Sequence, residues 1–339
     1  MAKRTLRIMI SLLLTAALLT VFFWNVDLAE VAVALRNADA PLLVVAAAIA
    51  LVAYWLRALR WQWILLPVAR TRHSSIVLAT VVGYAAIALL PARMGDLLRP
   101  ILLTRREPVP MSASLASILT ERIFDLWMVV LLFFIFLLRP PPMPAATTQA
   151  SSNLEILHMT GWVIGIGLVL GTVFLLALFR YQERFVALVT SPLERFKPAW
   201  KQPLVSFLGH FLDGLRVMQR PRDLVITMAS SCLLWLVICL QLHVTLTAFD
   251  VHLPYRATFL LLTLTVIGMA VPTPGGVGGF HAMLQLGLTG FFAVDYNLAT
   301  GFAIAHHALC FFPITLVGLV CIPVFGLSMK APSSEVSRP

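Results

Sequence analysis

Charged residues are scarce in this sequence. Of its 339 residues, 12% are charged and 60% are hydrophobic, whereas an average soluble domain is about 25% charged. The longest polar segment, residues 180–223, is too short for an ordinary catalytic domain. Several apolar runs reach the roughly 20 residues that cross a bilayer as a helix. The composition therefore excludes an ordinary soluble enzyme and predicts an all-α polytopic membrane protein.

Cysteine is also sparse. The sequence has four cysteines, all within apolar stretches and with no CxxC pair. This pattern argues against a disulfide framework and against a zinc site. A nucleotide-binding loop is not expected either, because no GK[ST] motif follows a soluble strand. We expect no metal, no cofactor and no catalytic residue.

Acidic residues are outnumbered, 15 against 25 Lys and Arg. No surface of interleaved basic and aromatic residues is evident, so we expect no nucleic acid partner. Loops at 25–40, 139–155 and 249–256 together hold three cations, whereas the segment from 180 to 222 is strongly basic. By the positive-inside rule, the sequence predicts a multi-pass protein of the bacterial inner membrane with both termini cytoplasmic.

The apolar runs divide the chain into two similar halves. Half one, about 1–138, and half two, about 157–327, both contain two spans, a broken hairpin and a further span, but they start from opposite sides of the membrane. The pattern predicts two inverted-topology repeats, each with three spans and one broken or re-entrant hairpin. Spans are expected at about 8–24, 41–66, 111–138, 157–179, 224–249 and 297–327, with hairpins at 74–104 and 257–295.

These elements would form a single integral membrane domain, residues 1–330. A proline-rich periplasmic connector at 139–156 separates the halves, and residues 331–339 would be a disordered cytoplasmic tail. Residues 25–40 are expected to be a short loop. An amphipathic helix on the membrane surface is expected over 204–218, where apolar residues recur at helical spacing.

The first hairpin is interrupted by a charged motif, "LLPARMGDLLRP". Pro91 breaks the helix, and Arg93, Asp96 and Arg99 then share one face if the segment is helical. Broken backbone at membrane depth is tolerated where it lines a protein cavity or water. We therefore predict a polar pocket open toward the cytoplasm, in which Arg93 and Arg99 bind an anionic headgroup.

The next span carries "TERIFD", about ten residues from its start. Glu121 and Asp125 share a helical face, with Arg122 beside them. Ionisable groups at this depth are costly and usually face a cavity or one another. A structural pair such as Asp125 with Arg93 is one interpretation. The one we favour is functional: Asp96, Glu121 and Asp125 balance the arginines or carry protons.

The second hairpin is interrupted by "PTPGGVGGFH". Gly275, Gly276 and Gly278 would leave backbone N–H groups free for an anion, although tight helix packing explains glycines equally well. Three histidines lie near this break, and either a relay with headgroup contact or simple hydrogen-bonded packing accounts for them. They are His281, His306 and His307.

One further mixed segment, "WLRALRWQW", ends the second span. Trp and Arg both favour the headgroup region of a bilayer. We interpret Trp55, Arg57, Arg60, Trp61 and Trp63 as an interfacial anchor in preference to a substrate site.

Together, "LLPARMGDLLRP", "ILTERIFDLW", "PTPGGVGGFH" and "HHALCFFPITLVGL" resemble the lysylphosphatidylglycerol synthase transmembrane, or flippase-like, family. The resemblance covers nearly the whole chain. Two positions depart from the family pattern: Asp96 stands where the family usually has Glu, and His281 where many members are acidic. The resemblance implies a single-domain member, without the aminoacyltransferase domain of two-domain members, involved in lipid, glycolipid or hopanoid traffic.

We therefore expect a lipid transporter or flippase-like protein that moves or binds an amphipathic lipid, either a phospholipid, a lipid-linked phosphate or a hopanoid. The alternative is an accessory or catalytic membrane subunit of a lipid-linked glycosyl or aminoacyl transfer pathway. A purely structural assembly partner is a third possibility. The expected partners are the lipid and the membrane, with a second copy of the chain or lipid-synthesis enzymes as further candidates.

Overall fold

The protein is helical throughout the part that the computed structural model describes. The described residues are 2–24, 26–90, 95–141, 221–271 and 273–325, with scattered residues between 159 and 209. The helices are α1 (Ala2–Phe22), α2 (Leu28–Asn37), α3 (Ala40–Leu65), α4 (His73–Leu89), α5 (Gly95–Thr104), α6 (Met111–Leu138), α10 (Pro221–Ala248), α11 (Ala257–Gly268), η3 (Pro274–Gly276), α12 (Gly279–Phe292), α13 (Tyr296–Cys321) and η4 (Ile322–Phe325).

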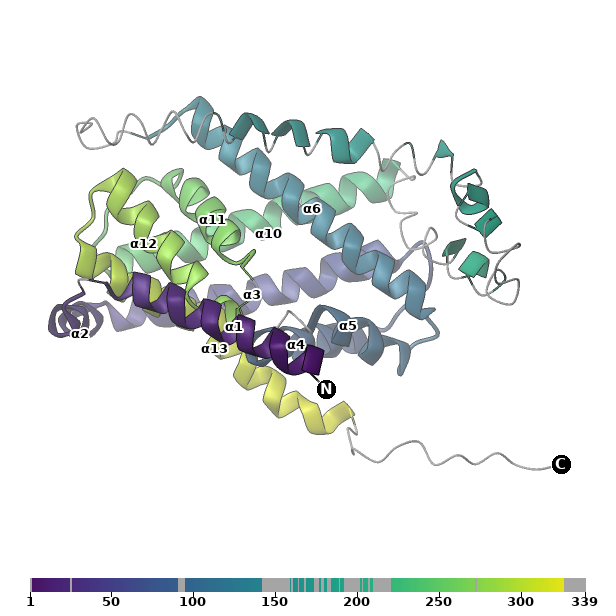
Figure 1. Cartoon of the computed structure of the whole chain (residues 1–339), viewed down its shortest axis with the longest axis horizontal. Helices are drawn as coiled ribbons and strands as arrows, with labels where there is room; N and C mark the ends of the chain where they lie inside the picture. The colour runs from purple at the N-terminus through teal and green to yellow at the C-terminus, as the bar shows by residue number, and fades with distance from the viewer. Residues whose placement is uncertain are drawn as a thin grey trace.

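Within these residues, three helices are long and apolar enough to cross a membrane, namely α3, α10 and α13. The 28-residue helix α6 is equally long but carries the buried charges. Figure 1 shows α3, α6 and α10 as long rods, with α11 and α12 at the α2 end of the molecule and α5 toward the opposite end. The helices thus confirm the all-α membrane protein that the composition predicts.

The main hydrophobic core joins α6, α10, α11, α12 and α13. Large side chains such as Phe136, Leu260, Leu284 and Phe302 are fully buried there. A smaller core around Trp61, Ile76 and Leu102 holds α3, α4 and α5 together. Aliphatic side chains also remain exposed along α3 and α13, as expected for helices that face lipid.

One expected loop is a helix. Residues 28–37 form α2 because the Asp27 carboxylate accepts hydrogen bonds from the N–H groups of Ala29 and Glu30, the usual N-cap arrangement. The helix then packs against α13. The prediction of a loop over residues 25–40 was wrong. The charged residues of this segment indicated a loop, whereas Asp27 caps a helix.

In each segment predicted to be a hairpin, two helices pack together, α4 with α5 and α11 with α12, and each pair approaches at two glycines. A Cβ added to Gly95 in α5 would lie 2.1 Å from the carbonyl oxygen of Gly83 in α4. A Cβ on Gly268 in α11 would lie 2.2 Å from the carbonyl oxygen of Gly279 in α12. Only glycine allows the backbones to approach this closely. The hairpins also meet each other, since η3 contacts α4.

Hydrogen bonds join the loops between helices into two groups, one at each end of the helices. The Asp39 N–H donates to the Ala248 carbonyl at 2.8 Å, and Arg256 donates to the carbonyl of Arg139 at 2.9 Å. At the other end, Arg72 donates to the Arg106 carbonyl at 3.4 Å. The first end contains loops predicted to be periplasmic, and the second contains loops predicted to be cytoplasmic. The predicted connector from residue 142, part of the 157–179 span, most of the 204–218 helix and the tail lie outside the described residues.

Candidate functional site: a buried ionic cluster beside a cavity

A cluster of charged side chains lies between α3, α4, α5 and α6. Its anionic centre is Glu121, which is fully buried. Arg99 donates to both carboxylate oxygens of Glu121, at 3.2 and 3.0 Å, in a bidentate pair. The guanidinium of Arg60, also fully buried, lies 3.3 Å from the same carboxylate. Such pairing is what makes an ionised carboxylate tolerable inside a membrane protein.

Asp125 forms the second anionic centre, one helical turn further along α6. Arg60 donates to its Oδ1 at 2.7 Å, so one arginine bridges both carboxylates. The Trp235 indole N–H from α10 donates to the same oxygen at 3.1 Å. Arg122 lies 3.4 Å from Oδ2 and Arg57 lies 3.9 Å from it. The cluster therefore ties α3 and α10 to α6.

The position of Arg99 depends on glycine and aromatic neighbours. A Cβ on Gly83 would lie 2.1 Å from Arg99 Cγ, so only glycine at that position leaves room for the arginine stem. The Arg99 guanidinium lies over the ring of Trp61 at 4.3 Å and near that of Tyr84 at 5.2 Å, as cation–π contacts. Arg99 is thereby fixed behind the cluster and does not line the cavity described next.

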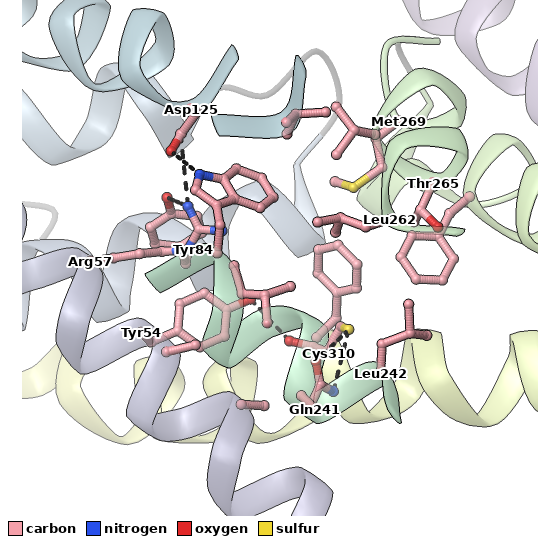
Figure 2. Close-up of a pocket in the computed structure, with 18 of the residues that line it drawn as sticks. Tyr54, Arg57, Tyr84, Asp125, Gln241, Leu242, Leu262, Thr265, Met269 and Cys310 are labelled. Carbon is pink, nitrogen blue, oxygen red and sulfur yellow. Dashed lines mark hydrogen bonds and ion pairs between the residues drawn. The ribbon is translucent and has the colours of Figure 1, made fainter. Parts of the chain in front are cut away.

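A cavity of about 320 Å³ opens beside this cluster. Figure 2 shows its two contrasting sides, with Arg57, Tyr84 and Asp125 on one and Leu262, Thr265 and Met269 on the other. Arg122 and Asp96 complete the polar end. The apolar walls come mainly from α10, α11, α12 and α13, with further apolar residues of α3, α4 and α6. The remaining lining residues include Tyr54, Trp235, Gln241, Val266, Phe280, His306, Cys310 and Phe311.

Polar atoms at the charged end have unused hydrogen-bonding capacity among the described residues. Asp96 Oδ1, Asp125 Oδ2 and Arg122 Nε have no hydrogen-bond partner there. The ion pair between Asp96 and Arg122, at 3.6 Å, is longer than a hydrogen bond. Among the described residues, the Arg57 side chain makes one hydrogen bond, 3.3 Å to the Tyr84 hydroxyl, and it lies against the rings of Tyr84 and Trp235. Arg57 and Arg122 are thus the arginines that face the cavity.

The second break is a tightly folded backbone turn. Gly275, Gly276 and Gly278 all have positive φ, at 60°, 71° and 92°, which favours glycine at these positions. Gly276 N–H donates to Thr273 and Gly278 N–H donates to His281 Nδ1. These two amides are therefore not the free anion-binding donors that the sequence suggested, because the turn uses them itself.

The histidines surround this break in different ways. His307 Nε2 donates to the Gly275 carbonyl at 2.9 Å, and the His281 and His307 rings lie 4.5 Å apart. His306 stacks on Phe302, has a Thr245 hydroxyl 3.3 Å from its Nδ1 and lines the cavity. No cluster of three or more His, Cys, Asp or Glu side chains with metal-binding geometry occurs within the described residues.

The sequence-predicted site residues thus separate into four groups. Asp96, Arg122, Asp125 and His306 line the cavity, whereas Arg99 and Glu121 lie in the ionic cluster behind it. The glycines, His281 and His307 form the second break. Arg93 lies outside the described residues.

Sequence reasoning missed several cavity and cluster residues. The interfacial interpretation of "WLRALRWQW" was wrong for three of its residues: Arg60 and Trp61 are fully buried, and Arg57 lines the cavity. Only Trp55 and Trp63 are exposed. The available signal was the spacing of the two arginines, three residues apart on one face of a membrane helix. Tyr54, Tyr84 and Trp235 gave no comparable signal.

Comparison with known families identifies the family of this chain. The sequence matches the family described as lysylphosphatidylglycerol synthase TM region over residues 8–318. The chain belongs to this family. The match includes α2 to α12, most of α13 and every described residue of the ionic cluster.

Two relatives match most of the chain at low sequence identity. Two proteins of Methanothermobacter thermautotrophicus, each called UPF0104 membrane protein, are 24% identical over 277 residues and 23% identical over 322 residues. They are covered to 77% and 90% of their length, and this chain to 78% and 89%.

The protein called Glycosyltransferase AglD of Haloferax volcanii is 34% identical over 125 residues, 36% of this chain. The matched part is 20% of the length of that relative. No solved structure matches the chain significantly.

Proposed function

We propose that this protein is a lipid transporter or flippase-like protein that takes an amphipathic lipid into the cavity and moves it across the inner membrane. The candidate lipids are a phospholipid, a lipid-linked phosphate and a hopanoid. The observation that carries the proposal is the division of the cavity. Arg57 and Arg122 face it at one end, and apolar side chains of α10, α11, α12 and α13 form its walls.

A lipid has the same division. Its headgroup would lie at the charged end, where the polar contacts of Arg57 to Tyr84 and Asp125 are long, 3.3 and 3.9 Å. Its apolar chains would follow the walls near Leu262 and Met269 and continue toward the bilayer. A volume of about 320 Å³ is within the usual range for small-molecule pockets, about 300–1,000 Å³, so it suits a headgroup and the adjoining part of the chains. Of the two predicted headgroup contacts, this assignment replaces Arg99 with Arg57 and Arg122, and Arg93 lies outside the described residues.

We further propose that the two broken hairpins belong to two inverted-topology repeats. Each hairpin closes on one glycine pair, and η3 of the second hairpin lies against α4 of the first. Relative motion of the hairpins at this contact would open the cavity to one side or the other. The distribution of loop cations supports cytoplasmic termini.

The orientation is tested by labelling single cysteines in a cysteine-free background. Cysteines at Asn37 and His252 should react with a membrane-impermeant reagent from the periplasm, and one at His73 should not. A cysteine at Gln202 should also stay protected. Periplasmic labelling at Gln202 would contradict the inverted arrangement.

Transport is tested in liposomes that contain the purified protein and a fluorescent phospholipid. A membrane-impermeant quencher should reach inner-leaflet lipid only if the protein exchanges the leaflets. Arg57→Gln should slow this exchange, whereas Arg36→Gln, the same change at an exposed position of α2, should not. Exchange no faster than in protein-free liposomes would overturn the proposal.

One observation favours a second candidate, a membrane subunit of lipid-linked glycosyl transfer. The Haloferax relative is called a glycosyltransferase, although only 20% of its length is matched. Aminoacyl transfer is the related possibility suggested by the family description. Mass spectrometry of a lipid-linked sugar donor after incubation with the protein distinguishes these functions, because a transferase consumes the donor and a transporter leaves it intact.

A further inference from the structure

A buried amide lies in the wall of the cavity, away from its charged end. Gln241 of α10 is 2% exposed and lines the cavity together with Cys310 of α13. It follows Trp235, which donates to the ionic cluster, by a distance of about 9 Å along the helix at 1.5 Å per residue. Figure 2 shows Gln241 and Cys310 between Tyr54 and Leu242. The amide therefore lies where the polar lining of the cavity gives way to the apolar walls.

The Gln241 amide has only weak polar partners within the described part of the chain. Its Nε2 and its Oε1 each lie 3.6 Å from the sulfur of Cys310. A thiol is a weak donor and a weak acceptor. The amide nitrogen carries two hydrogens, so one of its N–H groups has no partner there, whichever way the thiol hydrogen points. A buried polar group without a hydrogen bond is costly in a membrane protein, and a ligand in the cavity would remove that cost.

The polar groups around this amide are engaged with other atoms. The Tyr54 hydroxyl donates to the backbone carbonyl of Cys310 at 2.9 Å. The Thr245 hydroxyl donates to the backbone carbonyl of Gln241 at 2.8 Å and lies 3.3 Å from Nδ1 of His306. The Nε2 atom of His306 lies 3.7 Å from the Cys310 sulfur. These contacts do not use the amide hydrogens of Gln241, so its remaining N–H is available to an acceptor in the cavity.

We infer that Gln241 binds the carbonyl oxygen of an acyl ester, so that the cavity selects ester-linked glycerolipids over ether-linked and polyprenyl lipids. The inference rests on the proposed function and names a feature of the lipid other than its headgroup. In a glycerolipid the ester carbonyl lies a few bonds from the phosphate, where the headgroup meets the chains. With the headgroup at Arg57 and Arg122, the ester would lie at Gln241, and the chains would continue along Leu242 and Leu262. Ether-linked lipids and polyprenyl phosphates have no carbonyl there and would leave the N–H unpaired.

The test compares diacyl and dialkyl lipids by native mass spectrometry of the delipidated protein in mild detergent. The two members of each pair share a headgroup and a chain length. Pairs with ethanolamine and with glycerol headgroups are both measured, together with a polyprenyl phosphate. The diacyl member should bind about fivefold more tightly than the dialkyl member, the scale of one neutral hydrogen bond. The preference should be the same for both headgroups, because the ester contact does not involve them.

Three variants locate the contact. Gln241→Met keeps the length of the side chain but removes its donor, and it should abolish the preference for diacyl lipids. Cys310→Ala removes the thiol and leaves both amide hydrogens, so it should keep or increase the preference. Gln62→Met makes the same change as Gln241→Met outside the cavity lining, where Gln62 donates to the carbonyl of Thr71, and should retain the wild-type preference.

The outcomes separate this inference from the proposed function. Equal affinity for diacyl and dialkyl lipids in the wild type, or a preference that survives Gln241→Met, would overturn the ester contact and leave lipid transport standing. Tighter binding of the polyprenyl phosphate than of every diacyl lipid would do the same. Loss of the preference in Cys310→Ala or Gln62→Met would also overturn it, because the donor of Gln241 is still present in both. Binding of none of the lipids would overturn both the inference and the proposed function.

Discussion

The two broken hairpins use the same backbone device in different surroundings. α4 and α5 meet at Gly83 and Gly95, and α11 and α12 meet at Gly268 and Gly279, with carbonyl oxygens in the place of a side chain. The first hairpin carries Asp96 and Arg99 and borders the ionic cluster. The second has no Asp, Glu, Lys or Arg from residue 257 to 294, and it packs into the main apolar core.

This difference shows that the break and the charge are separate features. A break needs small residues and available backbone partners, and both hairpins provide these. The charges of the first hairpin need partners on other helices, since Arg99 pairs with Glu121 of α6. We therefore expect substitutions of charged residues to lower the stability of the first hairpin more than that of the second. Substitutions of the glycines at the helix contacts should lower the stability of both hairpins equally.

The largest effect should come from Glu121→Gln. This change removes the shared countercharge of Arg60 and Arg99, both fully buried. Breaking one side of a buried ion pair costs about 3–5 kcal/mol. Gln285→Leu in α12 removes a buried hydrogen bond to Thr300, 2.5 Å long, and should cost less, about 1–2 kcal/mol. Unfolding in mild detergent measures both, and a larger loss for Gln285→Leu would contradict the contrast.

The glycine contacts should matter equally in both hairpins. Gly95→Ala and Gly268→Ala each place a methyl group about 2 Å from a carbonyl oxygen, which the backbone must move to avoid. Overpacking of this kind costs about 1–3 kcal/mol, and sometimes more. Gly171→Ala, which has nothing within 4 Å of its added Cβ, is the control. Full thermal stability of either hairpin variant would show that its helices do not pack as described.

The base of the first hairpin is held by Glu107 in the turn before α6. Burial alone would raise the pKa of Glu107, but hydrogen bonds from Ser75 and Arg72 outweigh it and hold the pKa below its usual value. The folded state thus favours the ionised form of Glu107. Its contribution is present above the unfolded pKa of about 4.3 and is lost as the pH falls through the lower folded pKa.

This sign makes a specific comparison possible. Glu107→Gln should lower the unfolding free energy by about 1–2 kcal/mol at neutral pH, and the difference from wild type should disappear in acid. In the turn before the second hairpin, Asp250 forms an exposed contact with His252, so Asp250→Asn should change stability by less than about 0.5 kcal/mol. Unfolding curves across pH measure both, and a deficit of Glu107→Gln that persists in acid would refute the role of its charge.

Within the ionic cluster, the smallest effect on stability should come from Asp96→Asn. Asp96 is partly exposed to the cavity, and its distance of 3.6 Å from Arg122 exceeds a hydrogen bond. We expect a change of about 0.5 kcal/mol or less. A loss as large as that of Glu121→Gln would mean that Asp96 holds the fold together and does not tune the cavity.

Much of the fold follows from local sequence. The apolar run at 111–138 coincides with α6, and that at 41–66 lies within one residue of α3. α4 ends at Leu89, shortly before Pro91, and α11 ends at Gly268, shortly before Pro274, because proline and glycine act on the backbone within a few residues. The N-cap at Asp27 was equally local and could have identified α2.

The partners of the charges could not be obtained in this way. The sequence shows that charges occur at membrane depth and that they need compensation, because that cost depends on residue type and position in a span. It does not show that Arg60, 65 residues away, reaches Asp125, or that Trp235, 110 residues away, shares the same oxygen. Several pairings satisfy the same charges, and only helix packing selects among them.

What the sequence by itself determined is therefore the helical membrane class, the two breaks and the presence of costly buried charge, since each depends on residues close in the chain. The tertiary structure alone decided that Arg57 faces a cavity and Arg99 lies behind it. Both are arginines on apolar helices, and their roles differ because Gly83 leaves space for one and the rings of Tyr84 and Trp235 flank the other.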